Sequence, residues 1–212
     1  MNSQKMSPDL CDVHNALEQQ VVWIIYKWTI YVELFSDKET VDLLNTASPP
    51  TFRTVQDALF ADTVMTLARM SDPPKSAGKD NLSFQRLKKI VGKDFPGPIS
   101  KSCSALVDAF VDECEPLRDF RNRQLAHSDL QLSLGVSADP LPGISRKTIR
   151  TVLDRATEIL NQLARDILDS HTRFWDLDPG FTAEGLINAL SLAKETRLKQ
   201  LSDRQGAFDG RP

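Results

Sequence analysis

The sequence predicts an all-α fold, an antiparallel helical bundle with additional short helices. Apolar residues recur every three or four positions over most of the chain, which is the period of one helix face. Prolines and short polar runs divide this pattern into segments of helical length. The chain shows no internal repeat and no convincing pair of strands. Together these observations favour long helices packed against one another.

The N-terminal third of the chain contains three predicted helices. An apolar stripe indicates that the first runs over about residues 8–35. Residues 36–39, Ser-Asp-Lys-Glu, have the form of a capping box and predict the start of a short second helix. This helix ends before Pro49-Pro50, because a proline disfavours the helical conformation of the residue before it. A third, long helix carries Phe52 and is stopped by residues 72–74, Asp-Pro-Pro.

The middle of the chain is punctuated more often. Residues 75–80 predict a polar loop, after which Asn81 would cap a short helix closed by Gly92. Another helix carries the apolar residues of 105–110. Glu115-Pro116 then either breaks that helix or starts a new one with the proline at the first helical position.

The C-terminal part predicts one loop and two further helices. Residues 130–143 contain two Gly and two Pro, which indicates a loop or a short extended excursion. Ser145 would cap a long helix that reaches about Ile167. A turn at Phe174-Trp175 would lead to a last helix over about 182–201.

Length and charge bound the domain organisation and the partners. With 212 residues, we expect one helical domain over residues 1–204 and a disordered tail over 205–212. Apolar residues make up 41% and charged residues 26%, which is typical of an ordinary globular protein. The net charge of −3 provides no overall field that attracts nucleic acid. Any RNA contact must therefore come from a local basic patch.

Cysteine usage and hydropathy bear on location. The three cysteines are odd in number and lack paired metal-ligand spacing, which favours a reducing cytoplasm and predicts no metal site. The first ten residues are polar and lack the features of a signal peptide. The apolar run at residues 21–26 is far shorter than the roughly 20 residues that span a bilayer. We therefore expect a cytoplasmic protein without membrane contact.

Two Arg–His pairs share the same spacing: Arg121 with His127, and Arg165 with His171. Random placement of 14 Arg and 3 His in a chain of this length gives roughly 0.6 pairs in which the histidine follows the arginine by four to six residues. Spacing therefore does not identify a site. Arg165 and His171 lie near a predicted helix end, where basic side chains favourably meet the last carbonyl groups. That capping role is the simpler interpretation of the second pair.

The first pair has a setting that favours chemistry on a phosphate. Arginine can bind a phosphate and stabilise its transition-state charge, and histidine can move a proton near neutral pH. Small Ala126 leaves room for a substrate beside His127. Arg121 and His127 are thus the candidate catalytic residues of a site that handles RNA. Supporting candidates are Asn122, Arg123 and Asp129, and candidate RNA contacts are Arg118, Lys88 and Lys89.

Residues 121–129, Arg-Asn-Arg-Gln-Leu-Ala-His-Ser-Asp, resemble the Arg-polar-x3–5-His motif of the HEPN superfamily (higher eukaryotes and prokaryotes nucleotide-binding). Residues 62–73, which end in Ala-Arg-Met-Ser-Asp-Pro, and the Lys-Asp-Asn-Leu-Ser of 79–83 resemble the abortive-infection U type more narrowly. The resemblance covers about residues 10–200. It implies a dimerising helical bundle, a metal-independent ribonuclease without cofactor, and a toxin or antiphage role. An antitoxin or another defence-system protein is the partner class it implies.

Two other interpretations remain open from the sequence. Some HEPN members only bind nucleotides or act as scaffolds, and the acidic net charge and single motif histidine favour that class. A helical regulator without HEPN chemistry is the third. The histidine could be a helix cap, and the arginines could form a solvated face. Cleavage of RNA by attack of its own 2′-OH needs both a base and an acid, whereas one chain has a single motif histidine. A homodimer would supply two such histidines.

Overall fold

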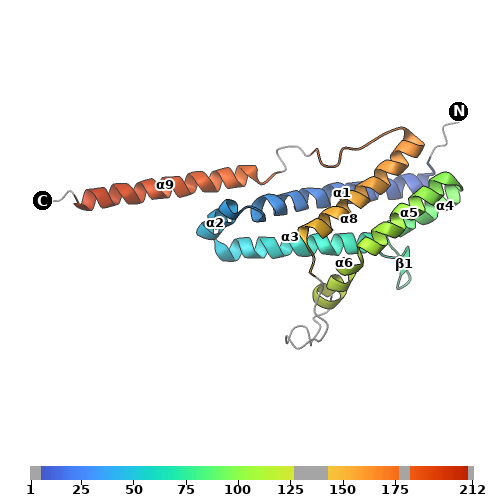
Figure 1. Ribbon diagram of the computed structural model, residues 1–212, viewed down its shortest axis with the longest axis horizontal. Coiled ribbons are helices and arrows are strands. Elements are labelled where there is room, and N and C mark those ends of the chain that lie inside the picture. Colours follow the sequence, from blue (N-terminus) through green and yellow to red (C-terminus); the bar gives the residue numbers. More distant parts are fainter. Residues whose placement is uncertain (1–5, 127–142, 177–181, 210–212) are drawn as a thin grey trace. The chain divides into compact units, whose positions relative to one another are not determined.

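The computed structural model describes residues 6–126, 143–176 and 182–209. Almost all described elements are helices, so the predicted all-α class is confirmed (Figure 1). The chain divides into two compact units, one of residues 1–25 with 61–176 and the other of residues 26–60 with 177–212. The expectation of one domain over residues 1–204 stays a prediction.

The core of the first unit forms where α5 (Pro98–Glu113) packs against α4 (Phe84–Asp94) and α8 (Arg146–Leu163) (Figure 1). Phe84 and Phe110 meet edge to face inside it, with ring centroids 4.8 Å apart. The N-terminal part of α1 (Pro8–Phe35), whose bounds match the predicted helix, adds an apolar stripe with exposures of 1% or less. That stripe consists of Leu10, Leu17, Val21 and Ile24.

Helix α8 has the cap and the apolar face that the sequence predicts. The hydroxyl of Ser145 accepts the amide of Thr148 at 3.0 Å, which satisfies one of the free donors of the first turn. Arg155 of α8 pairs with Glu113 of α5 at 3.0 Å, and this hydrogen bond raises the pKa of Arg155 above its usual value. The helix continues into a π-helical turn, η2 (Ala164–Leu168), where the backbone widens to i→i+5 bonding.

A small hairpin replaces the polar loop that the sequence predicts after α3 (Pro49–Met70). Strands β1 (Lys75–Ser76) and β2 (Lys79–Asp80) pair antiparallel. Ala77 and Gly78 connect them with φ of 47° and 77°, the left-handed pair that a tight two-residue hairpin turn needs. The expectation that the chain lacks a strand pair was wrong here, because two-residue strands are too short to show an alternating pattern.

The cap predicted for α4 was also wrong by two residues. Ser83 caps this helix, and its hydroxyl accepts the amide of Arg86 at 3.3 Å. The side chain of Asn81 instead donates to the Pro73 carbonyl at 2.8 Å and to the Ser76 hydroxyl at 2.9 Å. Asn81 thus closes the base of the hairpin. The helix passes through Gly92 and ends at Asp94.

The second unit contains the C-terminal end of α1, the N-terminal part of α3, α2 (Lys38–Ala47) and α9 (Glu184–Asp209). Trp28 and Tyr31 stack within it at 4.9 Å between centroids, and Tyr31 also meets Phe60. Helix α9 packs on α2. It runs to Asp209, beyond the predicted end near residue 201, since no proline interrupts residues 182–209.

Helix α2 begins one residue later than the capping-box pattern predicts. The Asp37 carboxylate accepts the Thr40 amide at 2.9 Å and is the cap, whereas the Ser36 hydroxyl donates back to the Val32 carbonyl. The predicted end of α2 before Pro49-Pro50 is confirmed, and Ser48 is the C-cap residue. No helix among the described residues has the length and apolar character needed to cross a bilayer.

Candidate functional site

The Arg-Asn-Arg-Gln-Leu-Ala run lies at the end of a helix that a proline starts. Helix α6 (Glu115–Phe120) has Pro116 in its first turn, so the second of the two predicted alternatives is confirmed. The helix then continues into η1 (Arg121–Ala126), a π-helical turn (Figure 1 places it below the α6 label). Because a π-helix bonds residue i to i+5, Arg121 and Ala126 are one turn apart. This places the start of the run over its end, which an α-helix does not do.

Arg121 is held from two directions. Its Nη1 donates to both carboxylate oxygens of Asp72, at 2.9 and 3.0 Å. Its Nε donates to the side-chain oxygen of the neighbouring Asn122 at 3.0 Å. The side chains of Arg121 and Asp72 are only 17% and 25% exposed. The guanidinium group is therefore fixed near the surface, and its charge is balanced by a carboxylate from a distant part of the chain.

The segment that carries Asp72 is tied down on both sides. Gln85 of α4 donates to the Ser71 carbonyl at 2.7 Å, and Arg118 of α6 donates to the Ser71 hydroxyl at 3.3 Å. Asn81 holds the carbonyl of Pro73 from the hairpin. Ser71 itself is buried, at 1% exposure. The short link after α3 thus has fixed contacts to α4, α6 and the hairpin.

The other two arginines of this helix also have acidic or carbonyl partners. Arg118 donates to the Val111 carbonyl at 2.7 Å, which satisfies an acceptor in the last turn of α5. Arg123 lies 3.4 Å from Asp119, with its side chain 18% exposed. Asn122 is exposed and accepts from Arg121. The alternative of a solvated face that these arginines form with Asp119 is met in part, since Arg123 pairs with Asp119, but the arginine side chains are half-buried.

The two lysines predicted to contact RNA differ from each other. Lys88 lies on α4 and pairs with Asp108 of α5, 2.6 Å away. Lys89, the next residue, is exposed. The charge of Lys88 is therefore balanced by Asp108, while Lys89 presents a cation on the surface of the same helix.

The second Arg–His pair lies in a different environment. Arg165 and His171 are both exposed, and Arg165 bonds to Gln162 on its own helix at 2.9 Å. The Ala164 carbonyl at this helix end accepts the Ser170 amide, with Asp169 in the left-handed conformation. Backbone groups thus make the cap that the sequence assigns to His171. Both arginines lie on π-helical turns, so the local backbone does not distinguish the two pairs. The difference is that Arg121 bonds to Asp72, 49 residues away in the chain, whereas among the described residues Arg165 bonds only to its own helix.

Of the remaining predicted site residues, His127 and Asp129 lie outside the described part of the chain. They follow Ala126, the last residue of η1, directly in sequence. The third histidine, His14, is 4% exposed and faces the Leu160 carbonyl at 3.3 Å inside the first unit. It is a core residue and has no access to a substrate.

Buried thiols near this site are not nucleophiles. Cys114, at the start of α6, has no exposed surface, and burial raises its pKa to about 12. Cys103 of α5 behaves in the same way, with burial raising its pKa to about 12. Because the thiolate is the reactive form, both groups stay protonated and inert near neutral pH.

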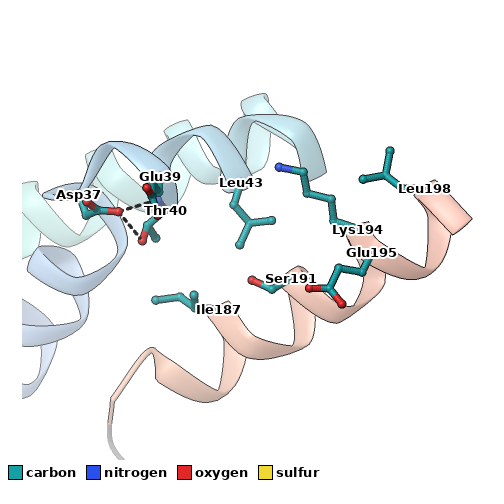
Figure 2. A pocket seen from close by; sticks show the side chains of 9 residues that line it. All are labelled: Asp37, Glu39, Thr40, Leu43, Ile187, Ser191, Lys194, Glu195 and Leu198. Carbon is teal, nitrogen blue, oxygen red and sulfur yellow. Dashed lines mark hydrogen bonds between the residues drawn. The ribbon is translucent and has the colours of Figure 1, made fainter.

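A separate hollow lies in the second unit, between α2 and α9 (Figure 2). It encloses about 380 Å³, and its walls include Leu43 of α2 and Ile187 of α9. Its charged lining consists of three carboxylates, Asp37, Glu39 and Glu195, and one ammonium group, Lys194. An acidic lining repels a polyanion. None of the predicted site residues lines this hollow.

The sequence did not predict a role for Asp72. It lies in the Ala-Arg-Met-Ser-Asp-Pro segment, 49 residues before Arg121. Its position after a helix and before a proline is also typical of a plain helix stop. The signal that could have found it is the joint occurrence of this segment and the Arg-Asn motif in one chain.

The helical fold and the Arg-Asn-x4-His run define a HEPN-type protein. A family model described as AbiU2 matches residues 7–185, which is most of the chain. The chain therefore belongs to the HEPN AbiU2 family, as its sequence motifs indicated. No curated protein and no solved structure matches it.

Proposed function

We propose that the chain is a metal-independent HEPN endoribonuclease of toxin or antiphage defence, with a composite Arg/His site at a homodimer interface. The observation that carries the proposal is the fixed guanidinium of Arg121 at the head of the motif. A preorganised cation stabilises charge that develops in a transition state without reorganising at that moment. The exposed pair at Arg165 lacks this property among the described residues.

The reaction needs one base and one acid. The 2′-hydroxyl of a ribose loses its proton to a neutral histidine as its oxygen bonds to the adjacent phosphorus. The bond from phosphorus to the 5′-oxygen breaks, and a protonated histidine gives its proton to that oxygen. The products are a 2′,3′-cyclic phosphate and a 5′-hydroxyl. His127 fills both roles when two copies of the chain meet, and Arg121 binds the phosphate.

The supporting residues act around this pair. Asn122 accepts from the Nε of Arg121 and so orients it. Arg123 adds charge next to the phosphate, and Asp129 orients the imidazole of His127. Of the three predicted RNA contacts, exposed Lys89 extends the contact along the RNA backbone, whereas Arg118 and Lys88 already donate to groups of the protein. Three free cysteines and an RNA substrate fit a cytoplasmic location, and an antitoxin or defence-system protein is the expected regulator.

The test is cleavage of a mixed-sequence RNA by the purified chain in EDTA. We expect cleavage, with cyclic phosphate and 5′-hydroxyl ends, and a loss of about 100-fold or more in His127→Ala and in Arg121→Ala. His171→Ala is the matched control and should cleave as the unsubstituted chain does. Circular dichroism checks that each variant keeps its helices.

Two outcomes would contradict this proposal. A well-folded chain that leaves diverse RNAs intact would remove the ribonuclease function. Loss of activity in His171→Ala with full activity in His127→Ala would place the chemistry at the other pair.

A non-catalytic HEPN module that binds a nucleotide or a partner is the second candidate. Its support is the ion pairing of Arg121 with Asp72 and of Arg123 with Asp119, which leaves these side chains balanced by carboxylates. The net charge of −3 points the same way. This function predicts nucleotide binding that depends on Arg121 while RNA stays intact.

A further inference from the structure

We propose that Asp72 is a positioning residue of the RNA site, which holds Arg121 so that its second terminal nitrogen faces the scissile phosphate. This inference rests on the proposed ribonuclease function. It adds a residue from α3's C-terminal link to a site otherwise built from the α6–η1 run.

The donors of Arg121 divide into used and available groups. A guanidinium has five N–H donors in a fixed plane. Nε uses its single hydrogen on Asn122, and Nη1 donates to the two oxygens of Asp72. Among the described residues, the two hydrogens of Nη2 have no such acceptor. The bound edge of the group thus determines where the remaining edge points.

Asp72 can act as a fixed reference because its own backbone is fixed. Its amide donates to the Arg69 carbonyl at 3.0 Å, and the flanking Ser71 and Pro73 carbonyls accept from Gln85 and Asn81. The following proline also restricts the backbone of Asp72. A side chain whose support is rigid holds its partner within the narrow range that catalysis needs.

The charge of Asp72 has a defined consequence. It balances Arg121 while RNA is absent, so a partly buried cation is not left without a partner. Both carboxylate oxygens sit on Nη1, so the phosphate is bound through Nη2 without displacing the carboxylate. The pairing orients the arginine and does not compete with the substrate.

The experiment compares the unsubstituted chain with Asp72→Ala and Asp72→Asn, in EDTA, on a short fluorescent RNA. We expect kcat to fall about 10- to 100-fold in Asp72→Ala, as for other residues that orient a reacting group. KM should change by less than about threefold, because the guanidinium of Arg121 keeps its charge and still attracts the phosphate when it is no longer held in one orientation. Asp72→Asn keeps the shape and one acceptor, so its kcat should lie between the two.

A second readout does not depend on activity. The guanidinium Nε–H of Arg121 should give a resolved side-chain signal in nitrogen-proton NMR spectra, slow to exchange with water and identified by its loss in Arg121→Lys. Asp72→Ala should merge it with the signals of exposed arginines. Asp72→Asn, which keeps the side-chain shape, serves if Asp72→Ala does not fold.

Glu113→Ala is the matched control. Glu113 pairs with Arg155 across two helices, and the two side chains are 26% and 28% exposed, close to the values for Asp72 and Arg121. It removes a comparable ion pair away from the motif, so kcat and the Arg121 signal should be unchanged.

The outcomes separate this inference from the function beneath it. An unsubstituted chain that cleaves no RNA would overturn the proposed function and the role of Asp72 in it. An active chain whose kcat and Arg121 signal survive Asp72→Ala would overturn the inference alone. A rise in kcat in Asp72→Ala would also overturn it, because the carboxylate would then be blocking the phosphate position.

Discussion

Arginines three positions apart on the α6–η1 run have different partners and therefore different expected roles. Arg118 donates to the Val111 carbonyl and the Ser71 hydroxyl, both of which belong to the protein framework. Arg121 donates to a carboxylate and an amide oxygen and stays 17% exposed. At the scale of single residues, Arg118 supports the fold first, and Arg121 is the residue suited to a phosphate.

Arg118→Ala should lower the free energy of unfolding by about 1–3 kcal/mol, because it leaves the Val111 carbonyl and the buried Ser71 hydroxyl without their donor. Lys89→Ala removes an exposed cation from the same unit and should change stability by no more than about 0.5 kcal/mol. Urea unfolding of both variants gives the comparison. Equal stability of Arg118→Ala and the unsubstituted chain would show that the framework contacts contribute nothing.

The sequence could identify Arg121 but not its partner. Short motifs report residues that are close in the chain, whereas Asp72 reaches Arg121 from 49 residues away. The same limit affects Lys88, whose pairing with Asp108 depends on how α4 packs on α5. His127 and Asp129 were predicted from the motif and lie outside the described residues, so their roles stay predictions.

At the scale of elements, periodicity predicts helices well and caps less well. The bounds of α1 match because an apolar stripe over 28 residues has few alternative placements. The caps of α2 and α4 were misassigned because Ser, Asp and Asn near a helix start compete for the same role. At α2 the hydrogen bond goes to Asp37, and at α4 to Ser83.

The cap of α2 makes stability depend on pH. The hydrogen bond from the Thr40 amide lowers the pKa of Asp37 below its usual 3.8. A carboxylate whose folded pKa is lowered adds stability above its unfolded pKa, and this stability is lost as the pH falls through the folded pKa. Asp37→Ala should therefore lower the thermal midpoint at pH 7, by an amount that shrinks below about pH 3.8.

Circular dichroism at pH 7 and at acidic pH measures this difference. Ser36→Ala is the control, because Ser36 lies beside the cap but bonds back to Val32. Its effect should not depend on pH. A difference between Asp37→Ala and the unsubstituted chain that is the same at both pH values would exclude the charged cap as its cause.

At the scale of the whole molecule, the chain has one motif histidine, whereas the proposed RNA cleavage needs two proton-transfer groups. Of the other two histidines, His14 is buried and His171 belongs to an exposed helix end. A two-fold dimer supplies the missing group without a new residue. The sequence predicts such a dimer only indirectly, from the shortage of groups in one copy, because a composite site would be a property of two copies.

The measurement that tests this account most directly uses a heterodimer of the unsubstituted chain and His127→Ala. The two chains are co-expressed with different tags, isolated by two successive affinity steps, and assayed for RNA cleavage in EDTA. A site that needs both histidines predicts a loss of about 100-fold relative to the unsubstituted dimer. Retention of about half the activity would show that each copy works alone, and failure to recover any heterodimer would contradict the shared site.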